Sequence, residues 1–60
     1  MFEQFLGKIC EARVAGFGDS FGRIVRGTLD SYDNDYLLLI SKKSKTLIAI
    51  KALLTLDVFE

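Results

Sequence analysis

The spacing of apolar residues changes from a helical period to a strand period near residue 10. The first group recurs at the spacing of one apolar helix face and consists of Phe2, Phe5, Leu6 and Ile9. This predicts a short N-terminal helix over 2–9, which must lie on an apolar surface because an isolated helix of this length is unstable in water. From Cys10 to Val14 apolar and polar residues alternate, which predicts a half-buried strand.

Turn signals divide the rest of the chain into four more strands. A glycine-rich stretch over 16–22 predicts the first turn, and short Asx residues over 33–35 predict a tight one. The predicted strands cover 23–33, 36–40, 46–51 and 53–59, with a further turn over 41–45. Gly27, inside the second strand, predicts sharp bending there.

The last two predicted strands carry apolar residues on both faces. They include Leu47, Ile48, Ala49, Ile50, Leu53, Leu54, Leu56, Val58 and Phe59. One face can pack inward, but the predicted elements include no helix to cover the other. A second copy of the chain would cover that face and pair the exposed strand edges.

Composition also favours self-association. Sixty residues allow one domain, over 1–60, and a fold of this size buries only about 60% of the surface of its unfolded chain. The single cysteine cannot form an internal disulfide, and with no histidine the soft ligands are too few for a zinc site. Oligomerisation remains as the source of added stability.

Charge and hydropathy limit the partners. No apolar run approaches the roughly 18 residues of a membrane span, and the first residues lack signal-peptide features, so we expect a cytoplasmic protein without membrane contact. Eight basic and eight acidic residues cancel, which leaves no global field for nucleic acid. The charges are unevenly distributed, however, because the second half of the chain contains Lys42, Lys43, Lys45 and Lys51. This lysine cluster indicates either a solvated hairpin turn or a basic patch.

Catalytic chemistry is poorly represented. With no histidine, the hydroxyl and thiol groups have no evident base beside them, and we expect neither an enzyme nor a cofactor. Cys10 lies on the apolar side of its strand, which favours a core position over a reactive thiol. Asp30, Asp33 and Asp35 favour a turn over a metal site, because no longer acidic loop surrounds them.

One segment resembles a known family. The run Gly27-Thr28-Leu29-Asp30-Ser31-Tyr32-Asp33-Asn34, followed by Leu37-Leu38, is similar to the first signature motif of the Sm/LSm superfamily, in particular bacterial Hfq. An N-terminal Phe5-Leu6 and the closing Lys51-Ala52-Leu53-Leu54-Thr55 resemble the order of Hfq elements over nearly the whole chain. The resemblance implies a mostly β fold: a short N-terminal helix followed by a strongly bent, five-stranded antiparallel Sm-like barrel.

The resemblance also implies a function. Such barrels form closed homo-oligomeric rings of about five to eight subunits, with a hexamer or heptamer favoured. They bind U-rich or A-rich single-stranded RNA, as RNA chaperones or riboregulators. Carried over by position, Asn34 and Lys51 match family RNA-binding residues, and Gln4 matches an N-terminal glutamine. Asp33 would support the site, and Tyr36 is a candidate stacking platform, although strand alternation favours core packing for it.

Two positions differ from the family pattern. Asp35 stands where Hfq has a stacking aromatic residue, and Ala52 stands where the motif lysine is followed by histidine. They favour an alternative in which the Sm-like ring is an oligomeric scaffold that acts through protein partners without RNA. A third hypothesis is an unrelated small β-barrel with a DNA-binding or regulatory role.

Overall fold

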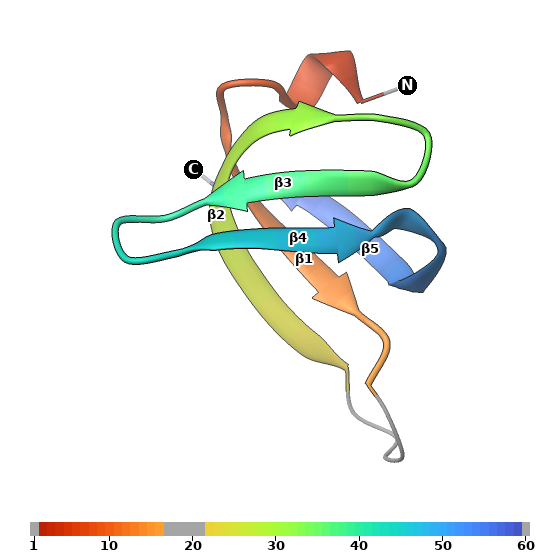
Figure 1. Ribbon diagram of the computed structural model, residues 1–60. Coiled ribbons are helices and arrows are strands. Elements are labelled where there is room, and N and C mark those ends of the chain that lie inside the picture. Colours follow the sequence, from red (N-terminus) through yellow and green to blue (C-terminus); the bar gives the residue numbers. More distant parts are fainter. Residues whose placement is uncertain (1, 17–21, 60) are drawn as a thin grey trace.

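The computed structural model describes residues 2–16 and 22–59, which form one antiparallel sheet and two short 3-10 helices (Figure 1). The elements are η1 (Glu3–Phe5), β1 (Ile9–Val14), β2 (Arg23–Tyr32), β3 (Tyr36–Ile40), β4 (Lys45–Ala49), η2 (Ile50–Ala52) and β5 (Leu53–Val58). The mostly β fold with five antiparallel strands is confirmed; the predicted turn over 16–22 lies largely outside the described residues. Neither helix in the described ranges is long and apolar enough to cross a membrane.

The predicted N-terminal helix is wrong beyond a single turn. Only Glu3–Phe5 is helical, and Ile9 already belongs to β1. Gly7 adopts a φ of 77°, a left-handed conformation that favours glycine and ends the turn. The Gly7 N–H donates to the Leu29 carbonyl at 2.9 Å, and the Leu29 N–H donates to the Lys8 carbonyl at 3.1 Å. Pairing with β2 therefore replaces the last helical turn.

In β1 the core follows the predicted alternation, with Cys10 and Ala12 facing inward. The fully buried members of the core come from β1, β2, β3 and β4 and are Cys10, Ala12, Leu29, Leu37, Leu39 and Ile48. Phe2 and Phe5 pack against this cluster, which confirms that the N-terminal segment lies on an apolar surface. Cys10 is completely buried, so its predicted place in the core is also confirmed.

Strand β2 connects two halves of the sheet. Residues 23–28 pair with β1, whereas Thr28 to Tyr32 pair with β3, so the two partners share little of its length. The strand is visibly curved in Figure 1. A Cβ atom on Gly27 would lie 3.0 Å from the Ile40 carbonyl oxygen, which means that β3 approaches the β2 backbone closely where the partner changes.

Strands β4 and β5 are the two edges of the sheet, yet they are adjacent in sequence. Only η2 joins them, so the sheet must curve to bring one end of each edge close to the other. The predicted fourth strand over 46–51 is therefore too long: the chain leaves β4 after Ala49, and Lys51 lies in η2. The Ile50 N–H donates to the Asp35 carbonyl at 2.8 Å, which fixes this departure.

Candidate functional site

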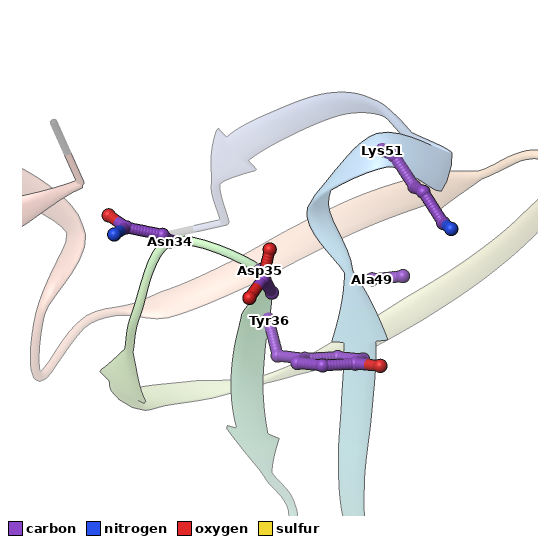
Figure 2. A pocket seen from close by; sticks show the side chains of 5 residues that line it. All are labelled: Asn34, Asp35, Tyr36, Ala49 and Lys51. Atoms are coloured by element: carbon purple, nitrogen blue, oxygen red, sulfur yellow. The ribbon is translucent and has the colours of Figure 1, made fainter.

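A pocket of about 190 Å³ lies where the β2–β3 turn meets the end of β4 and the start of η2 (Figure 2). It is lined by Asn34, Asp35, Tyr36, Ala49 and Lys51. Three of these, Asn34, Tyr36 and Lys51, are residues that the sequence predicted for a binding site. The volume is smaller than the roughly 300–1,000 Å³ of sites for drug-sized ligands, so the pocket suits a single ring or a side chain.

Asp33 shapes the turn that carries the pocket residues. Its carboxylate Oδ1 accepts the backbone N–H of Asp35 at 2.7 Å and that of Tyr36 at 2.8 Å, and its own N–H donates to the Tyr36 carbonyl at 3.0 Å. The two hydrogen bonds, first from Asp35 and then from Tyr36, lower the pKa of Asp33 because they stabilise the charged form. Asp33 holds the turn and does not itself line the pocket.

The β3–β4 register determines which side chains meet. Tyr36 pairs with Ala49 at the end of the hairpin, so the ring lies beside a small side chain that leaves space. The turn into η2 then carries Lys51 back over the same end. In Figure 2 the Lys51 side chain points toward the side of the pocket on which Ala49 and the Tyr36 ring lie.

The expectation that Tyr36 packs in the core is wrong. Its side chain is 45% exposed, because Leu37 and Leu39 take the inward positions of β3 and the alternation turns Tyr36 outward. Figure 2 shows the ring nearly edge-on, with one face turned toward the space beside Ala49 and Lys51. An exposed aromatic face beside an ammonium group is typical of sites that stack a base and neutralise its phosphate.

Comparisons with protein-family models, with curated proteins and with solved structures found no match to this chain. Membership of the Sm/LSm superfamily therefore stays a prediction. The site is interpreted from its own geometry and from the motif on which it lies.

Other predicted site residues do not join the pocket. Gln4 is exposed on η1, which packs beside the turn through an edge-to-face contact of Phe2 with Tyr32, with ring centroids 5.6 Å apart, but Gln4 does not line the pocket. Lys42, Lys43 and Lys45 lie at the opposite end of the β3–β4 hairpin, about 13 Å away along five residues of strand. The lysines therefore do not form one basic patch, and Lys51 is the only one of the four that lines the pocket.

Two pocket residues were not predicted as site residues. Ala49 could have been found from the hairpin arithmetic, because a turn centred on 41–44 places position 49 opposite Tyr36. Asp35 was interpreted as a turn residue and as a departure from the family pattern, and no local signal indicates that it lines the pocket. Asp30, Asp33 and Asp35 do not form a metal site. The described residues contain no group of three acidic, cysteine or histidine side chains that could hold an ion.

Proposed function

We propose that this chain is a ring-forming, Sm-like protein that binds single-stranded RNA at the pocket of Tyr36 and Lys51. The observation that carries the proposal is an exposed aromatic face and a lysine on one small pocket, which Asn34 also lines although its amide points away from Tyr36 and Lys51 in Figure 2. The ring can stack a base and the ammonium can neutralise a phosphate. The pocket also lies at the end of the segment that resembles the first Sm motif.

The fold supports the proposal at a coarser level. Five antiparallel strands whose two edge strands are joined by three residues are compatible with a small, strongly bent barrel of the Sm type. Gly27, the motif glycine, occupies the position where β3 approaches the β2 backbone. Asp33 and Asn34, the last two residues of the motif, form the turn that borders the pocket.

The sheet edges support ring formation. The outer sides of β4 and β5 have no partner strand among the described residues, and Leu47 and Leu54 on these strands are 62% and 58% exposed. An apolar groove of about 380 Å³ lies between β4 and η2 on one side and the ends of β1 and β2 on the other, and Leu47 and Ile48 line it. Pairing of β4 in one copy with β5 in the next would cover these strand edges, and such a head-to-tail contact forms a ring when the rotation between neighbouring copies closes.

Native mass spectrometry of the protein, alone and with a short unstructured RNA of mixed sequence, tests both parts of the proposal. We expect a closed ring of about five to eight copies that retains RNA. A monomer or simple dimer would contradict the Sm-like assignment.

Site variants test the pocket. We expect Lys51→Ala to weaken RNA binding and to reduce its salt dependence by about one phosphate contact. Lys43→Ala, at the other end of the hairpin, is the matched control and should bind nearly as the parent does. Tyr36→Ala should cost about 1–3 kcal/mol of binding, whereas Tyr36→Phe should retain most of it because the ring remains. Equal losses for Lys51→Ala and Lys43→Ala would argue against this pocket.

A second candidate is a scaffold ring without RNA. It is favoured by the zero net charge of the chain and by Asp35, whose carboxylate borders the pocket and would repel phosphate. A ring that retains no RNA at low salt, but that captures a protein from nuclease-treated extract, would support this candidate over the first.

A further inference from the structure

The Asp35 carboxylate is the pocket group that the proposed function leaves unused. The backbone of Asp35 is engaged, since its N–H donates to Asp33 and its carbonyl accepts from Ile50. Within residues 2–16 and 22–59 the side chain makes no hydrogen bond or ion pair. Neither carboxylate oxygen is therefore engaged within these residues, and Asp35 is one of the residues that line the pocket.

The position of this carboxylate relative to the ring suggests how a ligand would use it. Asp35 and Tyr36 are consecutive, and in Figure 2 the carboxylate lies at the near end of the Tyr36 ring while the ring extends below Ala49. Lys51 closes the other side of the same pocket. A planar base on the ring face would thus direct one edge toward Asp35 and leave its sugar and phosphate nearer to Lys51.

The hydrogen-bond donors and acceptors on each base decide which base edge can bind the Asp35 carboxylate. An ionised carboxylate is only an acceptor, so it requires donors on the ligand. Guanine presents two adjacent donors on its Watson–Crick edge, N1–H and the 2-amino group, which match two carboxylate oxygens. Uracil presents one N–H between two carbonyls, and adenine and cytosine each present an amino group beside a ring acceptor. These three bases would place an acceptor against the carboxylate, and an unpaired charge at the contact weakens binding.

We propose that this pocket selects a guanine base of single-stranded RNA, with Asp35 accepting N1–H and the 2-amino group while the base stacks on Tyr36. This inference rests on the proposed function, and it identifies the base for which the pocket is suited. Lys51 in the same pocket disfavours a cationic ligand, which an isolated carboxylate and aromatic ring would otherwise also attract.

The test uses short oligouridines in which regularly spaced bases are replaced by guanine, hypoxanthine or adenine. Hypoxanthine keeps N1–H and the purine ring but lacks the 2-amino group, so it removes one of the two donors. We expect the guanine strand to bind about tenfold more tightly than the adenine or unsubstituted strands, with hypoxanthine intermediate. Asp35→Asn should abolish the guanine preference. Asp30→Asn, an equal change of charge on the exposed part of β2, should keep it.

The outcomes separate this inference from the proposed function. If the parent protein binds none of the strands, the proposed function fails and this inference fails with it. If it binds them all equally, or if Asp35→Asn keeps the guanine preference, only this inference is overturned. Competition by guanosine monophosphate distinguishes RNA from a free nucleotide as the ligand. Weak competition supports a guanine base within RNA. Binding of the nucleotide as tight as that of the guanine strand would show that the ligand is a free nucleotide and would overturn the inference.

Discussion

At the scale of single residues, the Asp33 side chain accepts backbone hydrogen bonds that a main-chain carbonyl would accept in a regular strand or helix. One carboxylate oxygen accepts the N–H groups of Asp35 and Tyr36, which would otherwise point from the turn without a partner in the chain. Short Asx side chains do this readily because their acceptor reaches the main chain two and three residues on. The orientation of Asp35 and Tyr36, and hence of the pocket, depends on this local interaction.

The stabilisation by Asp33 should depend on pH. The pKa of Asp33 is lowered in the folded chain from the usual value of 3.8. A lowered carboxyl pKa stabilises the fold at pH values above the unfolded pKa, and this stabilisation is lost as the pH falls through the folded pKa. We therefore expect Asp33→Asn to lower the urea midpoint most at neutral pH, with a difference from the parent that shrinks below about pH 4.

The control for this prediction is Ser31→Ala, a neutral change at an exposed position of β2. Its difference from the parent should not vary with pH. A constant difference for Asp33→Asn across the same range would mean that the turn does not depend on the ionised carboxylate.

At the scale of elements, β2 determines the form of the sheet because it pairs with β1 along one half and with β3 along the other. The change of partner occurs beside Gly27, where no side chain separates the strand from the backbone of Ile40. The pairing of β2 with β3 also shifts register between Leu29 and Ser31, and such irregularities increase the local twist. Bending is thus concentrated in the segment that resembles the Sm motif.

A side chain at position 27 should be strongly destabilising. A Cβ there would lie 3.0 and 3.1 Å from the Ile40 carbonyl oxygen and carbon, and backbone atoms cannot move aside as a flexible side chain can. We expect Gly27→Val to lower the free energy of unfolding by about 2 kcal/mol or more, measured by urea denaturation. Thr28→Val, which introduces the same residue at the next, half-buried position without a change of side-chain shape, is the control and should cost clearly less.

Gly27→Val and Thr28→Val must be compared with the parent at one protein concentration, since self-association would add to apparent stability. Equal unfolding midpoints for Gly27→Val and the parent would show that the close approach of β3 is not required.

At the scale of the whole molecule, much of the apolar surface remains outside the core. Exposed side chains on the two edge strands and the residue after β5 include Leu47, Leu54, Val58 and Phe59. Phe59 is partly engaged, because the Arg26 guanidinium lies 4.4 Å from its ring centroid while Arg26 also pairs with Glu11 at 2.8 Å. The oligomeric ring of subunits that we propose would cover Leu47 and Leu54, because it joins β4 of one copy to β5 of the next.

A charge on the outer edge of β4 should therefore prevent assembly. We expect Leu47→Glu to shift the sedimentation coefficient from that of the ring to that of smaller species. The matched control is Ile24→Glu, because Ile24 is similarly exposed, at 52%, but lies on β2 within the sheet. Sedimentation of Leu47→Glu unchanged from the parent would exclude β4 from the interface.

The local features of this protein were determined by the sequence alone. The alternation of apolar and polar residues placed Cys10 and Ala12 on the core side of their strand, and the pattern located the strands to within a few residues. The Asx turn was equally predictable. These features depend on neighbouring positions along the chain, where the strand period of two and the reach of a short side chain leave few alternatives.

Tertiary structure decided the features that depend on distant partners. Hydrogen bonding of residues 7 and 8 with Leu29 shortened the expected helix, and the Ile50 N–H bond to Asp35 turned Lys51 out of β4 and into the pocket. The inward packing of Leu37 and Leu39 made Tyr36 an exposed ring instead of a core residue. The hydrogen bonds join segments at least fifteen residues apart, and the exposure of Tyr36 depends on which face of β3 meets the core. The local sequence pattern specifies neither the distant partner nor the buried face.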